Sequence, residues 1–270
     1  GLPHRSQASA KDRGAMSMDR RRFLGVAGIS ALAIAGKSSL ETLAKGGQAE
    51  AAAGPRPATR WGMVIDLRKC LNEQGCAECV AACGRAHNVP RFEERAHEVK
   101  WIWAEPFEKV FPEQESRHAE SALKGKSLPV LCNHCDNPPC VRVCPVKATW
   151  KREDGVVMMD YHRCIGCRYC MAACPYGARS FNWLDPRPRV KELNPEFPTR
   201  TKGVVEKCNF CEERLAKGRL PACVEACKEK ALVFGNLSDP KSEVRELLKA
   251  RYAIRRKPEL GTDPSVYYVV

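Results

Sequence analysis

Sixteen cysteines fall into groups of four along the 270-residue chain, and their spacing restricts what the chain can fold around. The third group reads Cys164-x2-Cys167-x2-Cys170-x3-Cys174-Pro175. A tight C-x2-C-x2-C loop can wrap three thiolates around one iron–sulfur cube, while the last cysteine ligates a neighbouring cluster and the proline turns the chain away. One such run is half of a two-cluster unit, and it predicts electron transfer.

The other three groups are variants of this run. Each ends in C-x3-C, which places two thiols on one face of a helix, and the differences lie in the earlier gaps, where a loop can lengthen. The groups are Cys70-x5-Cys76-x2-Cys79-x3-Cys83, Cys132-x2-Cys135-x4-Cys140-x3-Cys144-Pro145 and Cys208-x2-Cys211-x11-Cys223-x3-Cys227. No cysteine is left over, so all sixteen are predicted ligands of four [4Fe–4S] clusters.

The four groups are related in pairs by an internal repeat. Residues 63–66 (MVID) align with residues 157–160 (VMMD), and a basic residue precedes the first cysteine in both places. Residues 131–135 (LCNHC) resemble residues 207–211 (KCNFC). The first group is therefore related to the third and the second to the fourth, which indicates duplication of a two-cluster unit.

Other uses of the cysteines explain the pattern less well. Disulfide scaffolds are mostly short secreted domains and do not require this run. Structural zinc at Cys132/Cys135 and Cys208/Cys211 would leave the remaining thiols without a metal. Haem c is excluded because no Cys-x-x-Cys is followed by His. No Ser/His/Asp arrangement, phosphate loop or open metal site is visible, so we expect no catalytic residues and a carrier rather than an enzyme.

A second informative segment precedes the cysteines. The run from Asp19 to Gly25 (DRRRFLG) contains Arg20 and Arg21 and is followed by a short apolar stretch and small residues, as in a twin-arginine export signal. Clusters are inserted in the cytoplasm, so their protein must cross the membrane folded, which this route permits. We expect residues 1–53 to be the signal region and the mature chain to lie on the periplasmic face of the cytoplasmic membrane. An uncleaved signal would act as an anchor, and residues 1–15, which precede Met16, indicate an over-extended start.

The basic charge of the chain does not predict nucleic-acid binding. Residues 1–53 carry eight basic and four acidic residues, so removing them lowers the net charge from +13 to +9. Four oxidised clusters with their thiolates would contribute about −8. We therefore expect a nearly neutral assembled protein. The basic residues beside the ligands either tune the reduction potentials of the clusters or are solvated surface charges. They are Lys69, Arg142, Arg163 and Arg168.

The sequence predicts short strands and helices around each cysteine group. The expected strands are 62–66, 156–160, 180–183, 204–207 and 231–234. The expected helices carry Cys79/Cys83, Cys140/Cys144, Cys170/Cys174 and Cys223/Cys227, and a further helix opens at Asp239-Pro240. Residues 87–126 form a cover or docking insertion with Trp101 and Trp103 in ordinary core packing, residues 185–201 form a surface loop, and His134 lies near the ligands without being one.

From Trp61 to Val270 the chain resembles the four-cluster iron–sulfur subunits of membrane-bound oxidoreductases, such as the partners of dimethyl sulfoxide reductase, polysulfide reductase and formate dehydrogenase. The resemblance rests on all four groups, on residues 164–177 (CIGCRYCMAACPYG) and on the tail 257–262 (KPELGT). It implies an α+β fold for residues 54–270, in which two bacterial-type two-cluster ferredoxin folds stand in tandem in a pseudo-twofold arrangement, with insertions.

The resemblance also implies how the ligands are shared. One cluster would be held by Cys70, Cys76, Cys79 and Cys227, and a second by Cys208, Cys211, Cys223 and Cys83. A third would be held by Cys132, Cys135, Cys140 and Cys174, and a fourth by Cys164, Cys167, Cys170 and Cys144. The first and fourth groups thus form an outer lobe and the inner two groups an inner lobe. Gly84 and Lys228 stand where the outer lobe would usually have proline.

The twin-arginine signal narrows the resemblance to the periplasmic subunit of the Dsr membrane complex (DsrO of DsrMKJOP). This implies a role in dissimilatory sulfur metabolism, relaying electrons between a periplasmic cytochrome c and a quinone-interacting membrane subunit of the NrfD/DsrP type. One alternative is the electron-transfer subunit of a molybdopterin reductase acting on polysulfide or tetrathionate, or of a nitrite reductase system. Another is a soluble exported ferredoxin without a fixed partner.

Overall fold

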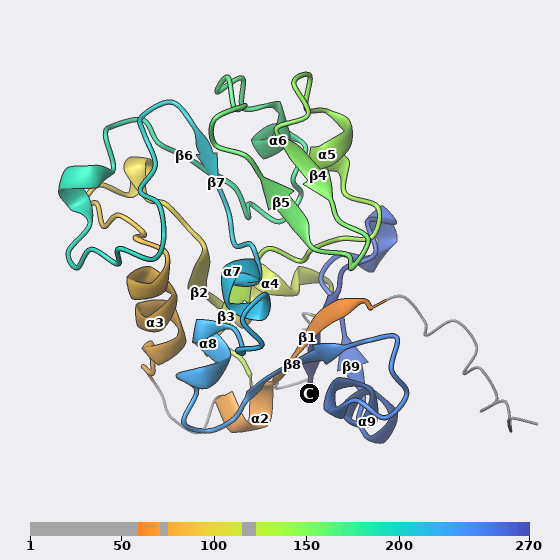
Figure 1. Ribbon diagram of the computed structural model, residues 1–270. Coiled ribbons are helices and arrows are strands. Elements are labelled where there is room, and N and C mark those ends of the chain that lie inside the picture. The colour runs from red at the N-terminus through yellow and green to blue at the C-terminus, as the bar shows by residue number, and fades with distance from the viewer. Residues whose placement is uncertain (1–58, 71–74, 115–122) are drawn as a thin grey trace, which may run out of the picture. The chain divides into compact units, whose positions relative to one another are not determined.

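The computed structural model describes residues 59–70, 75–114 and 123–270, drawn in colour in Figure 1. The expected twin-arginine region, residues 1–53, lies outside the described residues. Short strands and short helices are mixed throughout the described chain, as expected for an α+β fold. In the described ranges no helix is both long enough and apolar enough to span a membrane.

The largest sheet joins the two ends of the described chain. It has the order β8-β1-β10-β9, formed by Leu232–Asn236, Trp61–Asp66, Val266–Val269 and Ala253–Ile254. Strand β1 runs parallel to β10 and antiparallel to β8. Alternate residues of β1 point to opposite faces of the sheet. Val64 packs against Val244 of helix α9 (Glu243–Ala250), whereas Met63 and Ile65 join the main core.

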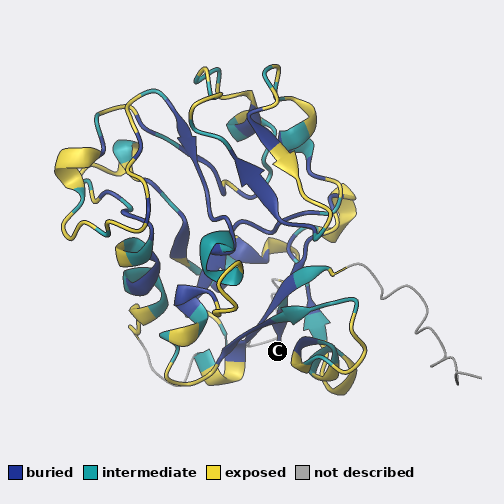
Figure 2. Ribbon diagram, viewed as in Figure 1, coloured by how far each residue is buried: buried dark blue, intermediate teal, exposed yellow. Residues whose placement is uncertain are grey.

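Three two-stranded ribbons complete the strands of the described ranges. They are β2–β3 (Ile102–Pro106 with Ser127–Leu131), β4–β5 (Thr149–Lys151 with Val157–Met159) and β6–β7 (Ser180–Phe181 with Val205–Glu206), all antiparallel. Strands are therefore present at all five expected positions. Trp101 and Trp103 are buried in the main core beside or within β2, which confirms their expected packing role. Figure 2 shows the strands largely dark blue, with exposed residues gathered on loops and helix surfaces.

The strand pairings of the two halves follow one scheme. The strand before the first cysteine group (β1) pairs with the strand after the fourth (β8). The strand before the third group (β5) pairs with the strand after the second (β4). In Figure 1 the orange β1 and blue β8 accordingly lie side by side, as do the green β4 and β5. The internal repeat thus extends from sequence to topology.

Local geometry repeats as well. Asp66 and Asp160 each accept hydrogen bonds through Oδ1 from the amides two and three residues further on. After the second and fourth groups, the amides of Ala148 and Ala231 each donate to a cysteine Sγ four residues earlier, both at 3.2 Å. The sequence repeat aligns Asp66 with Asp160. Ala148 and Ala231 lie at the same distance after the last cysteine of a C-x3-C pair.

The helices are shorter than expected around three of the four C-x3-C pairs. The remaining helices are α2 (Leu67–Cys70), α3 (Glu78–Ala86), α4 (Phe107–Val110), α5 (Pro139–Arg142), α6 (Tyr169–Ala172), α7 (Glu212–Leu215) and α8 (Ala222–Glu225). Only α3 contains both cysteines of its pair. Cys144, Cys174 and Cys227 lie two residues beyond a helix end, because their amides bond to the carbonyl three residues earlier, which tightens the turn.

Two further expectations need correction. The last helix begins at Glu243 rather than at Asp239-Pro240, because Ser242 first closes a turn through its amide to the Asp239 carbonyl. The segment 185–201 is only partly a surface loop. Phe197 lies in the main core, and Arg200 is fully buried against Glu206 of β7, so this insertion fixes the chain before the fourth cysteine group.

Candidate iron–sulfur sites

All sixteen cysteines lie within the described residues, and all are free thiols. Cys76 is the exposed member of the set, whereas the other thiols are buried or half-buried. The thiols gather into sets that draw on distant parts of the sequence.

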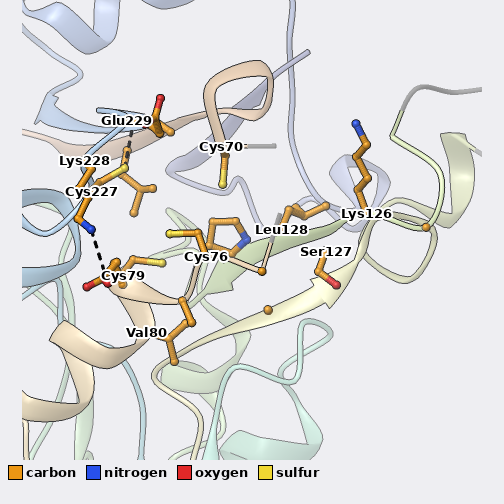
Figure 3. A pocket seen from close by; sticks show the side chains of 18 residues that line it. Cys70, Cys76, Cys79, Val80, Lys126, Ser127, Leu128, Cys227, Lys228 and Glu229 are labelled. Carbon is orange, nitrogen blue, oxygen red and sulfur yellow. Dashed lines mark hydrogen bonds and ion pairs between the residues drawn. The ribbon is translucent and has the colours of Figure 1, made fainter. Parts of the chain in front are cut away.

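The first set lines one cavity. Its members are Cys70, Cys76, Cys79 and Cys227. Figure 3 shows their sulfur atoms around a common space that Leu128 of β3 also borders. Burial raises the pKa of Cys70 to about 12 and the pKa of Cys79 to about 11, and neighbouring thiols add to both shifts. In this cavity a thiol becomes a thiolate when a metal replaces its proton.

The second set is enclosed by protein. Its members are Cys83, Cys208, Cys211 and Cys223, all buried. Burial raises the pKa of each, that of Cys208 to about 12, and for Cys83 the other three thiols add to the effect of burial. The amide of Phe210 donates to Cys208 Sγ at 3.4 Å, and the amide of Ala222 donates to Cys211 Sγ at 3.3 Å. Such N–H···S contacts stabilise negative charge on ligating sulfur.

The third set lines a second cavity. Its members are Cys132, Cys135, Cys140 and Cys174. Burial raises the pKa of Cys135 to about 12, with Cys132, Cys140 and Cys174 adding to the shift. This cavity joins the second cysteine group to the last cysteine of the third.

The remaining thiols lie on or next to α5 and α6, which pack on each other. They are Cys144, Cys164, Cys167 and Cys170. Burial raises the pKa of Cys170, and the thiols of Cys140 and Cys164 raise it further. Cys164 is half-buried, and Cys144 follows α5.

Neighbouring sets touch electrostatically in a linear order. Cys79 of the first set raises the pKa of Cys83 in the second. Cys132 of the third set raises the pKa of Cys208 in the second. Cys140 links the third set to Cys170 in the same way. Cys79 and Cys83 lie one turn apart on α3, Cys132 and Cys208 both belong to the main core, and Cys140 and Cys170 share a smaller buried cluster. The sets thus form a row rather than four isolated sites.

Two buried cations lie among the thiols. Lys207 is fully buried and donates to the carbonyls of Val157 and Cys208, and Arg179 donates to Cys140 Sγ. The sequence prediction missed both. By contrast, the four basic residues predicted beside ligands are all exposed: Lys69, Arg142, Arg163 and Arg168. Arg168 instead stacks over Trp183, 4.7 Å from the ring centroid.

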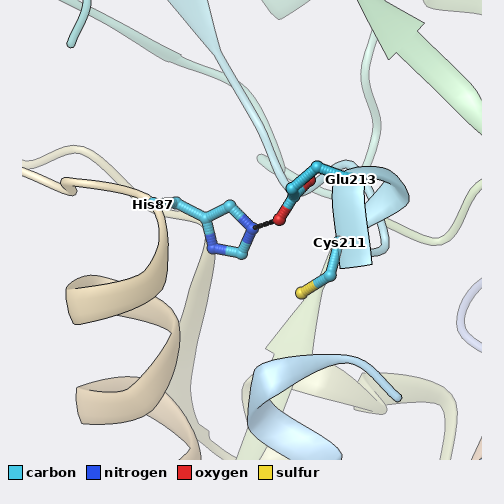
Figure 4. A group of neighbouring side chains, drawn as sticks. All are labelled: His87, Cys211 and Glu213. Atoms are coloured by element: carbon cyan, nitrogen blue, oxygen red, sulfur yellow. Dashed lines mark hydrogen bonds and ion pairs between the residues drawn. The ribbon is translucent and has the colours of Figure 1, made fainter. Parts of the chain in front are cut away.

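His87, Cys211 and Glu213 form a compact group, shown in Figure 4. His87 Nε2 lies 2.9 Å from Glu213 Oε1, while His87 Nδ1 lies 3.6 Å from Cys83 Sγ. Burial alone would raise the pKa of Glu213, but the hydrogen bond and charge of His87 bring it below its usual value. Because Cys211 and Cys83 belong to the second thiol set, this group is part of that site's wall.

His134 is fully buried within the second cysteine group, between two of its cysteines in the sequence. The amide of Val157 donates to His134 Nδ1 at 3.0 Å, and the ring stacks on Phe210 with centroids 3.7 Å apart. Burial, with the nearby Lys207, holds the pKa of His134 well below its usual value. The imidazole is therefore neutral and acts as a packing group.

The residues fit [4Fe–4S] clusters. Two sets of four thiols converge on cavities, sulfurs receive amide hydrogen bonds, and buried cations lie where ligating thiolates would carry negative charge. A bound cluster would supply one-electron redox chemistry, which none of these side chains provides alone.

Known proteins share this pattern. Two family profiles, both described as a 4Fe-4S dicluster domain, match residues 123–187 and 163–232. The chain is 43% identical over 271 residues to the Hdr-like menaquinol oxidoreductase iron-sulfur subunit 1 of Archaeoglobus fulgidus, covering 93% of this chain and 97% of that protein.

Two further relatives are similar over most of their length. The menaquinone reductase iron-sulfur cluster-binding subunit of Nitratidesulfovibrio vulgaris is 42% identical over 237 residues, covering 78% of this chain and 88% of that protein. The putative dimethyl sulfoxide reductase iron-sulfur subunit of Halobacterium salinarum is 41% identical over 213 residues, covering 78% of this chain and 79% of that protein.

Proposed function

Because the chain belongs to the ferredoxin-type iron–sulfur subunits of membrane oxidoreductases, we propose that it relays electrons along a row of four clusters between a periplasmic cytochrome c and a quinone-interacting membrane subunit of the NrfD/DsrP type. Like its relatives it is an electron-transfer subunit without a substrate site of its own, and its cofactors are four [4Fe–4S] clusters.

The row of thiol sets is the observation that carries this function. Electrons pass between clusters only where the clusters are close. A thiol of each set shares a helix or a buried cluster with a thiol of the next set and raises its pKa. The proposed ligand sharing follows the same sets: 70/76/79/227, 83/208/211/223, 132/135/140/174 and 144/164/167/170. In each cluster one cysteine comes from the partner group of its lobe.

The proposed pseudo-twofold arrangement has separate support. His134 and Phe210 occupy the same place in the repeated C-N-x-C segments, and both have a positive φ, 42° and 57°. Their rings stack on each other with 17° between planes. Residues related by a twofold axis meet in this way when they lie at the axis.

A Dsr-type complex of dissimilatory sulfur metabolism is our preferred setting. Two relatives are named for menaquinol or menaquinone chemistry, which supports a quinone-interacting partner. A third relative is named for dimethyl sulfoxide reductase, which favours the molybdopterin reductase alternative.

We place the protein on the periplasmic face, exported by the twin-arginine route. The match to the Archaeoglobus protein covers 93% of this chain and so extends into the first 53 residues, which supports treating this segment as part of the protein. Replacing Arg20 and Arg21 with lysine should retain the protein in the cytoplasm, whereas Arg22→Lys should leave export unchanged. Equal export of both variants would refute the proposed location.

The test of function is purification of the tagged protein from membranes in mild detergent, with companions identified by mass spectrometry and metals quantified. A multi-spanning NrfD/DsrP-like subunit, a cytochrome c and sixteen irons per chain, without molybdenum, would support the proposal. A molybdopterin subunit would favour the alternative. A lone monomer would refute a membrane complex and leave a soluble carrier.

A further inference from the structure

Arg179 is a buried cation in the inner lobe, directly before β6, with 4% of its surface exposed. Its Nη2 donates to Cys140 Sγ at 3.1 Å and to Thr149 Oγ1 at 2.8 Å, and Nη1 lies 3.7 Å from Met159 Sδ. Thr149 in turn donates its proton to the Met158 carbonyl at 2.6 Å, so its oxygen presents a lone pair to Arg179. The guanidinium is therefore held in one orientation by the β4–β5 ribbon.

Within the part of the chain that the structure describes, no carboxylate pairs with the charge of Arg179. A guanidinium stays protonated in proteins. Arg200, which is equally buried, pairs with Glu206 at 2.7 Å, but the hydrogen bonds of Arg179 go to two sulfurs and a hydroxyl. A buried charge without a counter-charge is strongly destabilising. The counter-charge of Arg179 is therefore the sulfur of cluster ligands.

Two sets of ligands feel this charge. Cys140 accepts the hydrogen bond, and Cys170 packs in the same buried cluster as Cys140 and Met159. There the charge of Arg179 lowers the pKa of Cys170, against the effect of burial. Cys140 belongs to the proposed third cluster and Cys170 to the proposed fourth. Arg179 thus lies between neighbouring clusters at one end of the row.

We propose that Arg179 is a positioning residue that holds one positive charge between the third and fourth clusters and raises the reduction potential of both. This rests on the proposed function and its ligand assignment. Each cluster gains one negative charge on reduction, so a fixed cation at its sulfurs favours the reduced form. Because both potentials are raised together, their difference is kept, and an electron is held at that end of the row.

Replacing Arg179 tests this in the purified complex, by redox titration followed by electron paramagnetic resonance. In Arg179→Met, two of the four midpoint potentials should fall. Each should fall by about 59 mV, which corresponds to an about tenfold smaller equilibrium constant for accepting one electron. Arg179→Lys keeps the charge and should restore most of the shift. The matched control is Arg163→Met, since Arg163 is exposed and adjacent to Cys164 but pairs with Asp160. It should leave all four potentials unchanged.

Unchanged potentials in Arg179→Met with sixteen irons per chain, or an equal fall of all four, would overturn the inference. If Arg179→Met fails to assemble its clusters, Thr149→Val decides, because it removes the hydroxyl that orients Nη2 while the charge remains. A smaller fall of the same two potentials supports the inference, and no change overturns it. Fewer than four clusters in the unaltered protein would instead refute the proposed function.

Discussion

Replacing Arg200 with methionine should be among the most damaging changes outside the cysteines. Arg200 Nη2 pairs with Glu206 Oε2 at 2.7 Å, and both side chains are 0% exposed. Arg200 also donates to the carbonyls of His87 and Asn88, at 2.5 and 2.9 Å. These bonds tie the insertion 185–201 to the end of α3 and to β7, directly beside the second thiol set.

The magnitude follows from what remains after the change. In Arg200→Met, the Glu206 carboxylate stays buried with two donors, Trp101 Nε1 at 2.9 Å and Asn182 Nδ2 at 2.5 Å. Removing one partner of a buried ion pair costs about 3–5 kcal/mol, a large part of a domain's total stability. Adding Glu206→Gln removes the unpaired charge and keeps a hydrogen-bonding side chain, so the double variant should recover most of the loss.

The assay is the rate at which cluster absorbance bleaches in guanidinium under anaerobic conditions, because unfolding with cluster loss is irreversible and is governed by a rate. Each 1.4 kcal/mol removed from the unfolding barrier accelerates the rate about tenfold. We expect at least tenfold faster bleaching in Arg200→Met. The control is Arg187→Met, which breaks an exposed pair with Asp185 in the same insertion and should change the rate little. Equal rates for Arg200→Met and the control would refute the reasoning.

Three further changes test the sites. Cys174→Ser should alter the spectrum of the third cluster and Cys170→Ser that of the fourth, so identical spectral changes in the two variants would contradict the ligand sharing. Gly166→Ala should destabilise the protein by more than about 1 kcal/mol, because the φ of Gly166 is +70° and a Cβ would lie 2.4 Å from the Gly203 carbonyl oxygen. The control is Gly84→Ala within α3, where a Cβ meets nothing within 4 Å. This variant should be neutral or stabilising in the same denaturation assay. Removing iron with a chelator should expose the core to protease at once, because the metal that holds the cavity-lining thiols together is lost. Slow cleavage of the iron-free protein would contradict this.

The repeat and five of the strands were predictable, because a cluster needs its loop held at fixed places and a strand therefore lies next to a cysteine group. These strands are β1, β5, β6, β7 and β8, whereas β2, β3, β4 and β9 were not predicted. Strand β10 was not predicted, because its parallel pairing with β1 joins residues about two hundred positions apart, from Met63 to Val266, and no local pattern announces it.

Buried charge was the least predictable part of the site. Arg163 and Arg168 stand next to ligands in the sequence but point to solvent. Arg179 and Lys207 are buried. Sequence distance from a cysteine does not indicate on which side of the chain a long basic side chain lies, and only the packed ribbons decide it. The loop 185–201 was misjudged for the same reason, since Arg200 looks like one more surface charge in a basic segment.

The stack of His134 on Phe210 limits how such a duplicated protein can evolve. Repeat-related residues such as Asp66 and Asp160 each bond within their own loop, so a substitution at one of them does not touch the other. In the stack each copy supplies one ring of a single contact, so a change in either copy alters the environment of both. The pair has diverged in chemistry, imidazole against phenyl, while keeping two flat rings of compatible size. We expect substitutions at these two positions to be correlated among descendants of the duplication, more strongly than at any other repeat-related pair.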